Sequence, residues 1–292
     1  MGADWDGELA RRLVELRHRT GCGVITMVYD LVPLTHTHLA FHNDPGLFER
    51  YFRTLIEASD VITCISHQSR RDLIDFAEAR ALDLRRAEVL VLGESLPPAD
   101  VSPPTRDDFY LCVGTIERRK NIELVYDALR VLESEGRDLP RVVVAGAPGW
   151  GTSDLLAELE QQSTAASRAM VLLGSVDDRT LDHLYRTARA LLFPTYFEGW
   201  GLPVREAAIR GCPVAAGDSP AVREAASGYA AATFLPSDDP GPWADFMMAG
   251  PRTADQAAVR PWSVVASDLL VMAQSLDVGR ARGTSRAAAS SR

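Results

Sequence analysis

From Phe109 onward, the sequence repeats one pattern: a short, continuously apolar run followed by a helical stretch. FYLCVGTI precedes NIELVYDALRVLES, RVVVAGA precedes SDLLAELEQQ, and AMVLLGSV precedes DRTLDHLYRTAR. RALLFP, PVAAG and ATFLP continue the series, each before another helical region. Strands that are apolar on both faces, each followed by a helix, indicate a parallel sheet covered by helices on both sides. Six such units predict a complete doubly wound α/β domain.

The N-terminal part of the chain has the same alternation of strand-like and helical stretches, but fewer repeats of it. Three strand-like runs, CGVITMVYDL, DVITCIS and AEVLVL, alternate with helical stretches, and GELARRLVELRHRT forms a helix ahead of them. The proline-rich stretch GESLPPADVSPPTRDD then reads as a linker, and VGRARGTSRAAASSR as a disordered tail. The sequence therefore predicts a partial N-terminal Rossmann-like domain at 1–100, a C-terminal ligand-binding domain at 101–277 and a disordered tail at 278–292.

Two helix starts can be predicted in the N-terminal part. Asp44 is an expected N-cap, because Pro45 follows it at the first helical position. Ser66 is an expected N-cap for the helix that begins in HQSRRDL.

Charge and composition exclude several classes of protein. A net charge of −9 argues against general nucleic-acid binding, although it leaves room for a local basic pocket. No apolar run reaches membrane-spanning length, and the N-terminus lacks the apolar core of a signal peptide. A cytoplasmic protein is therefore expected, with peripheral membrane contact left open. P-loop, Rossmann dinucleotide and GxSxG motifs are absent.

Two carboxylates flank a glycine-rich loop in PTYFEGWGLPVREAAIRG. Ligands of open parallel sheets bind beyond the carboxyl ends of the strands, where this loop follows RALLFP. Glycines let the backbone approach a ligand, and a helix N-terminus favours phosphate. Glu206, inside the helix, can accept hydrogen bonds from ribose hydroxyls, and Glu198, on the loop, from sugar hydroxyls. In one alternative, Glu206 only interacts favourably with the helix dipole and Glu198 is a solvated acid on the loop. In another, the two carboxylates catalyse glycoside hydrolysis.

A basic loop, GTIERRKN, follows the first strand of the C-terminal half. It places Arg118, Arg119 and Lys120 at a second strand carboxyl end. Arginine forks and lysine point charges both suit a diphosphate. A solvated run of charges is the alternative, but two such sites at equivalent ends of one sheet favour a nucleotide-sugar pocket.

These segments together resemble glycosyltransferase family 4 over roughly residues 20–275, most strongly over 109–235. The resemblance implies a GT-B fold, in which two Rossmann-like parallel-sheet domains face a cleft. It also implies transfer of a hexosyl group, such as a mannosyl group, from a nucleotide-diphosphate sugar with retention of configuration. The resemblance further implies a carbohydrate or lipid-linked acceptor and a role in polysaccharide biosynthesis. No metal and no cofactor beyond the co-substrate are expected.

The resemblance implies roles for individual residues. Glu198 would contact the donor sugar and Glu206 the ribose, while Arg119 and Lys120 would bind the diphosphate; Glu198, Arg119 and Lys120 form the expected catalytic set. Thr115 stands where many members have an arginine. The remaining expected donor-binding residues are Gly114, Val176, Gly199, Trp200, Gly201 and Leu202.

The N-terminal half departs further from the family pattern. Tyr29 stands where many members have histidine, so Tyr29 and Asp30 are expected on the acceptor side. His36, His38 and His42 follow, but no carboxylate or cysteine cluster completes a metal site. An ordinary loop or polar acceptor contacts are the favoured interpretations of these histidines.

The family's opening strands and glycine-rich loop have no counterpart, so the first domain is expected to be incomplete, with about three strands. A protein partner could complete it. The hypothesis is therefore a retaining glycosyltransferase. The alternatives are a non-catalytic nucleotide-sugar-binding or assembly subunit, and a sugar-nucleotide epimerase of the same fold.

Overall fold

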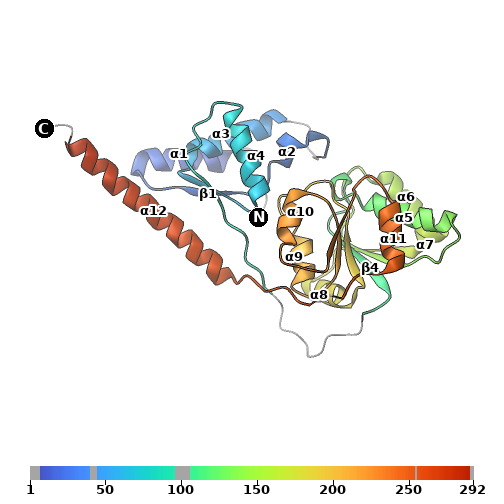
Figure 1. Cartoon of the computed structure of the whole chain (residues 1–292). Helices are drawn as coiled ribbons and strands as arrows, with labels where there is room; N and C mark the ends of the chain where they lie inside the picture. The colour runs from blue at the N-terminus through green and yellow to red at the C-terminus, as the bar shows by residue number, and fades with distance from the viewer. Residues whose placement is uncertain (1–6, 40–44, 96–105, 254, 290–292) are drawn as a thin grey trace. The chain divides into compact units, whose positions relative to one another are not determined.

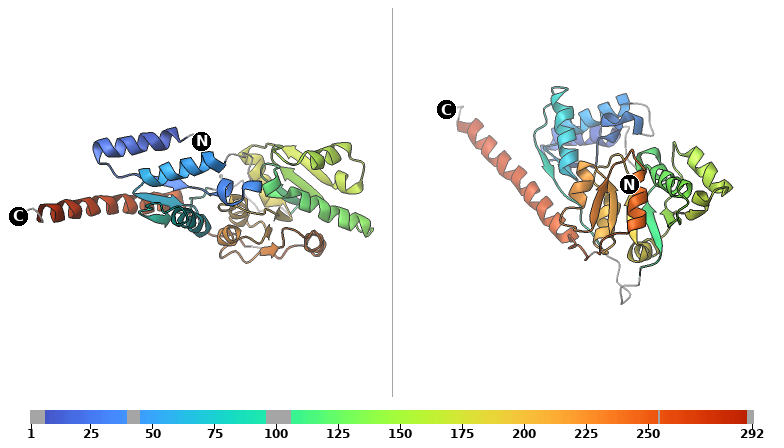
Figure 2. Two further views of the ribbon diagram at one scale, coloured as in Figure 1. Left: turned by 90° about the horizontal axis from the view of Figure 1, so that it is seen from above. Right: turned by 45° about the vertical axis from the view of Figure 1, so that its right-hand side comes forward.

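The computed structural model describes the chain except for residues 1–6, 40–44, 96–105, 254 and 290–292. The chain divides into two compact units. The first comprises Met1–Glu94 together with Arg260–Arg292, and the second comprises Ser95–Val259 (Figure 1). Figure 2 gives two further views of the same elements.

The second unit is built on a six-stranded sheet in which every pair of neighbouring strands is parallel. The strand order is β6-β5-β4-β7-β8-β9, which is the 3-2-1-4-5-6 order of doubly wound folds. Leu111 on the central strand β4 lies opposite Val143 on β5 and Leu191 on β7. The strands are β4 (Phe109–Val113), β5 (Arg141–Ala145), β6 (Met170–Gly174), β7 (Ala190–Phe193), β8 (Val214–Gly217) and β9 (Ala232–Leu235).

Helices cover both faces of this sheet, as continuously apolar strands require. α5 packs against α7 and α11 on one face, while α9 packs against α8 and α10 on the other (Figure 1). The prediction of a doubly wound domain is confirmed. The helices are α5 (Ile122–Ser134), α6 (Ser153–Gln161), α7 (Ala165–Ala169), α8 (Asp178–Thr187), α9 (Leu202–Ala208), α10 (Pro220–Ala225) and α11 (Gly241–Ala249), with a short 3-10 turn, η2 (Arg118–Lys120).

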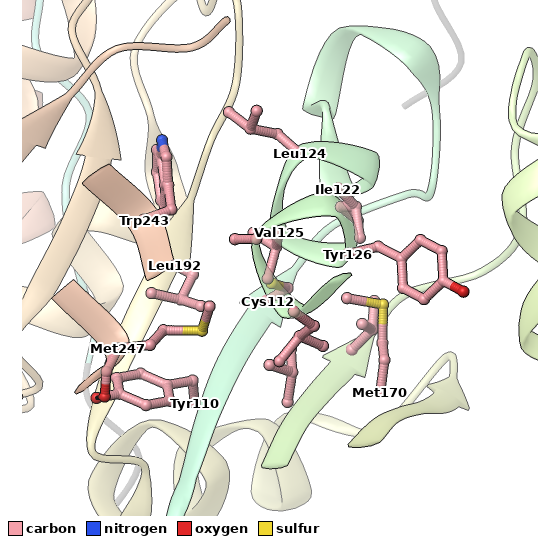
Figure 3. Close-up of a cluster of buried hydrophobic side chains, with 14 of the residues drawn as sticks. Tyr110, Cys112, Ile122, Leu124, Val125, Tyr126, Met170, Leu192, Trp243 and Met247 are labelled. Atoms are coloured by element: carbon pink, nitrogen blue, oxygen red, sulfur yellow. Dashed lines mark hydrogen bonds between the residues drawn. The ribbon is translucent and has the colours of Figure 1, made fainter. Parts of the chain in front are cut away.

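The main hydrophobic core lies between this sheet and the helices α5, α6, α7 and α11. Figure 3 shows side chains of β4, β7, α5 and α11 converging there. Trp243 is fully buried and its ring nitrogen donates to the carbonyl of Pro236 over 2.7 Å. Tyr110 is equally buried and donates to the carbonyl of Met247 over 2.7 Å. Each large side chain buried here contributes roughly 1.5–3 kcal/mol, which makes this unit a rigid platform for its loops.

The first unit contains a three-stranded parallel sheet of order β1-β2-β3, as the sequence predicts. α1 packs against α3, and α4 packs against β2 and β3. Ser66 caps α4 by accepting from the backbone N–H of Ser69 over 2.9 Å, which confirms that prediction. The elements are α1 (Glu8–Thr20), β1 (Ile25–Val28), α2 (Val32–Thr35), η1 (Thr37–Leu39), α3 (Pro45–Ala58), β2 (Val61–Cys64), α4 (His67–Glu78) and β3 (Ala87–Val89).

The end of the chain differs from the division predicted from the sequence. Helix α12 runs from Trp262 to Ala289, so a helix occupies most of the segment expected as a disordered tail. The helix belongs to the first unit rather than the second. A Cβ atom on Gly93 would lie 2.5 Å from the Trp262 ring, and one on Gly23 would lie 3.0 Å from Leu276. The change of unit therefore falls near Arg260, not at residue 277.

Some sequence-based expectations fall outside the described residues: the Asp44 cap, His42 and residues 96–105 of the linker. Within the described part of the chain, no helix is long and apolar enough to cross a membrane. The same part holds no group of three His, Cys, Asp or Glu side chains placed to bind a metal ion.

Candidate functional site

The candidate site lies in the second unit, where the strand order reverses. β4 and β7 are neighbours, and the helices that follow them cover opposite faces of the sheet. The loops that leave their carboxyl ends therefore lie at the switch point of the sheet, which is where ligands of this fold bind. These are the basic loop after β4 and the glycine-rich loop after β7.

Glu198 is the centre of the site. Only 8% of the residue is exposed, so its carboxylate needs partners. Oε1 accepts from Lys120 Nζ over 2.6 Å and from Thr195 Oγ1 over 2.9 Å. Oε2 pairs with Arg119 Nη1 at 2.7 Å. The structure thus brings Glu198, Arg119 and Lys120 into direct contact, although 78 residues separate Lys120 from Glu198.

These contacts decide the charge state of the site. Burial alone would raise the pKa of Glu198, but the charges of Lys120 and Arg119 outweigh burial and hold it below its usual value. Glu198 is therefore ionised at neutral pH. A carboxylate offers about four acceptor positions, of which these partners use three. Among the described residues, the fourth position, on Oε2, has no further partner.

Arg119 joins the two loops at both its ends. Its side chain donates to the Phe197 carbonyl over 3.1 Å and pairs with Glu117 at 2.8 Å. Its own carbonyl accepts from the backbone N–H of Tyr196 over 3.0 Å and from Thr195 over 3.1 Å. Because backbone and side chain are both held, the guanidinium has a fixed position between the loops. Arg118, in contrast, is exposed and stays outside this cluster.

Asn121 adds a further connection between the loops. Its side-chain amide donates to the carbonyls of Pro194, over 3.1 Å, and Ser237, over 2.8 Å. Its backbone has φ 56° and ψ 33°, the left-handed conformation that asparagine tolerates better than most residues. This conformation ends the turn that holds Arg119 and Lys120 and begins α5.

Two glycines allow the loops to pack this closely. A Cβ atom on Gly146, after β5, would lie 1.9 Å from the carbonyl oxygen of Gly114. A Cβ atom on Gly217, at the end of β8, would lie 2.4 Å from the carbonyl oxygen of Thr195. Real Cβ atoms do not make such contacts, so these positions require glycine.

Glu206 lies on α9, which begins at Leu202 with Pro203 in its first turn, as the sequence predicts. Its Oε2 accepts from the hydroxyl of Tyr185 on α8 over 2.8 Å. Burial raises the pKa of Glu206 above its usual value, and the hydrogen bond from Tyr185 offsets part of that effect. The two glutamates thus have opposite environments: Glu198 faces cations, while Glu206 faces a phenol.

The other predicted donor-binding residues line the same loops or end neighbouring strands. Gly199 and Trp200 are buried, and Leu202 is 48% exposed. Gly114 and Gly201 have φ of 126° and 111°, respectively. Val176 is half-buried and follows β6. Their contacts with a donor remain predictions.

Tyr29 and Asp30 lie in the first unit, after β1. The Tyr29 side chain is 56% exposed, and Asp30 accepts from the backbone N–H of Val32 over 3.0 Å. The rings of His36 and His38 are 6.3 Å apart. An acceptor-side role for Tyr29 and Asp30 remains a prediction.

Sequence reasoning missed four residues of the site: Glu117, Asn121, Tyr185 and Thr195. Glu117 lies inside the quoted basic loop, and an acid beside two cations is a recognisable signal. Tyr185 contacts Glu206 from another helix, and Thr195 contacts the distant Arg119 carbonyl as well as the nearby Glu198, so no simple local pattern marks either residue. The left-handed conformation of Asn121 is equally invisible in the residue order.

Residues 98–247, just over half of the chain, match the family described as glycosyl transferases group 1. The protein is a member of this family. Among curated proteins, it is 29% identical over 174 residues to the O-antigen chain mannosyltransferase B of Escherichia coli. That match covers 57% of this chain and 45% of the relative, so the chain spans under half the length of that mannosyltransferase.

Solved structures support the fold. Sucrose-phosphate synthase from Thermosynechococcus elongatus matches with a TM-score of 0.65 and 16% identity, covering 91% of this chain and 70% of the synthase. Anabaena Alr3699/HepE, crystallised with UDP and glucose, matches with a TM-score of 0.61 and 14% identity. That match covers 82% of this chain and 66% of the Anabaena protein. This group 1 member thus has the α/β GT-B fold with parallel sheets.

Proposed function

We propose that the protein is a retaining glycosyltransferase of family 4, which transfers a hexosyl group from a nucleotide-diphosphate sugar to a carbohydrate or lipid-linked acceptor. One observation carries the proposal: Glu198, Arg119 and Lys120 meet at the switch point of the six-stranded sheet. Family membership and the transferases among the relatives favour an enzyme over a non-catalytic binding subunit.

In the proposed reaction, Arg119 and Lys120 bind the diphosphate of the donor. Arginine can bind phosphate oxygens in pairs, and Lys120 has three N–H donors, of which Glu198 uses one. The negative charge on the diphosphate increases as the glycosidic bond breaks. Fixed cations stabilise that developing charge without reorganising, which lowers the barrier electrostatically.

Glu198 has two tasks in this proposal. It holds the two cations in place, and the remaining acceptor position on Oε2 binds a hydroxyl of the donor sugar. Glu206 accepts hydrogen bonds from the ribose hydroxyls of the nucleotide. These contacts would fix the anomeric carbon relative to the acceptor, and such orientation supplies a large part of enzymatic rate acceleration.

Retention follows, in this proposal, from a front-face substitution at the anomeric carbon. The acceptor oxygen forms its bond on the face from which the diphosphate departs. The acceptor proton passes to the leaving phosphate oxygen, so no separate catalytic base is needed. The reaction as proposed uses no metal and no cofactor beyond the donor.

The relatives support a choice of donor class. Two are named as O-antigen chain mannosyltransferases and another as a serotype-specific mannosyltransferase, which supports a mannosyl donor and a role in polysaccharide synthesis. Anabaena HepE was solved with UDP and glucose, which keeps uridine donors in consideration. Cytoplasmic location, peripheral membrane contact with a lipid-linked acceptor and a partner for the first unit remain predictions.

A thermal-shift screen tests this proposal. The protein would be heated with the UDP-, GDP- and ADP-linked forms of glucose and mannose. We expect one nucleotide to stabilise the protein, by about 2.7 kcal/mol at 100 times its Kd. Release of the matching nucleoside diphosphate on adding acceptor would then report transfer. Stabilisation by none of these donors would contradict the proposal.

A further inference from the structure

Tyr185 is a fully buried tyrosine whose hydroxyl touches the second glutamate of the site. None of its surface is exposed, and its hydroxyl donates to Glu206 Oε2 over 2.8 Å. A buried phenol needs a hydrogen-bond partner, because an unsatisfied hydroxyl costs about 1–3 kcal/mol. Phenylalanine would fill the same space without needing a hydrogen-bond partner. The presence of tyrosine here therefore points to a use for the hydroxyl.

The direction of this hydrogen bond is fixed. Burial, together with the charge of Glu206, raises the pKa of Tyr185 well above its usual value. The phenol thus keeps its proton throughout the working pH range and donates a hydrogen bond to the carboxylate. Among the described residues, Oε2 has this partner and the other oxygen, Oε1, has none.

The backbone of Glu206 is held from the same side. Arg210 Nη1 donates to the Glu206 carbonyl over 2.9 Å, and Arg210 Nε bonds Asp182 over 2.7 Å. Arg186 bonds the other oxygen of Asp182 over 2.7 Å. Asp182 and Arg186 lie on α8, as Tyr185 does. Helix α8 therefore positions both the main chain and the carboxylate of Glu206.

We propose that Tyr185 is a positioning residue for nucleotide binding: it fixes one oxygen of Glu206 so that the other receives the ribose hydroxyls. This inference rests on the proposed function, because it requires a nucleotide ligand. A carboxylate that is already held in one rotamer loses little conformational entropy when the ligand binds. The hydrogen bonds to ribose therefore contribute more to the binding free energy.

The same hydrogen bond affects ionisation. The groups that act on Glu206 are Tyr185 and Asp178 from α8, and Arg210 just after α9. Tyr185 and Arg210 lower its pKa, while burial and Asp178 raise it. Removing the phenol would raise the pKa further, so Glu206 would be protonated at a higher pH. A protonated Glu206 is a poorer acceptor for ribose hydroxyls.

The test compares Y185F with Y229F, a matched control. Tyr229 is also buried in the second unit, and its hydroxyl donates to the Cys212 backbone carbonyl over 2.8 Å rather than to a carboxylate. Calorimetry would measure Kd for UDP, GDP and ADP and for the 2′,3′-dideoxy form of each, from pH 5 to pH 8. E206A would be measured beside them.

For the diphosphate that binds, we expect Y185F to weaken affinity about 5- to 20-fold, a loss equivalent to one hydrogen bond. Its dideoxy form should bind Y185F and the unmodified protein equally. The pH below which affinity falls should be higher in Y185F, while Y229F should match the unmodified protein throughout.

Two outcomes would overturn the inference. If E206A removes the preference for ribose over dideoxyribose but Y185F keeps it, with an unchanged pH profile, Tyr185 has no positioning role and the proposed function stands. If none of the diphosphates binds the unmodified protein, the proposed function fails and this inference fails with it.

Discussion

Glu198 combines deep burial with a full negative charge, and this combination makes it the most sensitive residue of the site. A buried charge is tolerated only when partners compensate for lost hydration, and here Arg119, Lys120 and Thr195 do so. Removing one member of such a cluster leaves the others uncompensated, and that typically costs about 3–5 kcal/mol.

We expect E198Q to lower the free energy of unfolding at pH 7, since two cations lose their counter-charge. The pKa of folded Glu198 lies below 4.5, its reference value. Its ionisation therefore stabilises the fold above about pH 4.5, and this contribution disappears as the pH falls through the folded value. Urea unfolding at several pH values measures both effects.

The difference in stability between the unmodified protein and E198Q should shrink as the pH drops below about 4.5. E160Q is the control, because Glu160 is exposed on α6 and should change stability by less than about 0.5 kcal/mol. A difference independent of pH would mean that Glu198 is not held ionised by its neighbours.

Individual residues of the site could be predicted only where a local pattern marks them. Glu198, Arg119 and Lys120 were predictable because charges stood directly after buried strands. Tyr185 was not, since only the fold brings it to Glu206. Asn121 was not, because its importance lies in a left-handed backbone conformation.

At the scale of elements, the strands of the second unit needed glycines at their ends as much as apolar residues within them. The loops after β4 and β5 touch at Gly114 and Gly146. A side chain at Gly146 would force these loops apart and displace the turn that carries Arg119 and Lys120.

We expect G146A to destabilise the protein by several kcal/mol, because its Cβ would lie 1.9 Å from a backbone oxygen that cannot move alone. G241A is the control: at that position the nearest atom is 3.2 Å away, on the flexible side chain of Asp239. Thermal unfolding compares them. Equal melting temperatures for the two variants would show that the loops separate at little cost.

The sequence predicted elements well where apolar runs were continuous, as in all six strands of the second unit. Prediction failed at α12, because this helix has little apolar periodicity to place it. Leu269, Leu270 and Val271 are 40–66% exposed in the structure. A polar, arginine-rich C-terminal segment without a clear apolar face has the sequence pattern of a disordered tail.

At the scale of the whole molecule, the chain leaves the first unit and returns to it with α12. Deleting residues 262–292 should therefore loosen the first unit and leave the second intact. Hydrogen exchange would show faster amide exchange in β1 and β3, while α5 and β4 keep their protection. Faster exchange confined to the second unit would contradict this assignment of α12.

The central claim is that the second unit binds a nucleotide-sugar at its switch point through Arg119 and Lys120. Calorimetry of R119Q/K120Q tests it most directly, because glutamine keeps an N–H donor beside Glu198 but removes the charge. The titrations are run at a temperature at which thermal unfolding shows the variant to be folded, since loss of the two cations destabilises the buried carboxylate. R118Q is the control, since Arg118 is exposed in the same turn. We predict that R119Q/K120Q binds the nucleoside diphosphate about 100-fold more weakly and the bare nucleoside nearly as well as before, as expected for two lost charged contacts of about 1.5 kcal/mol each. R118Q should bind both ligands normally. Equal losses for diphosphate and nucleoside, or no loss for either, would contradict the claim.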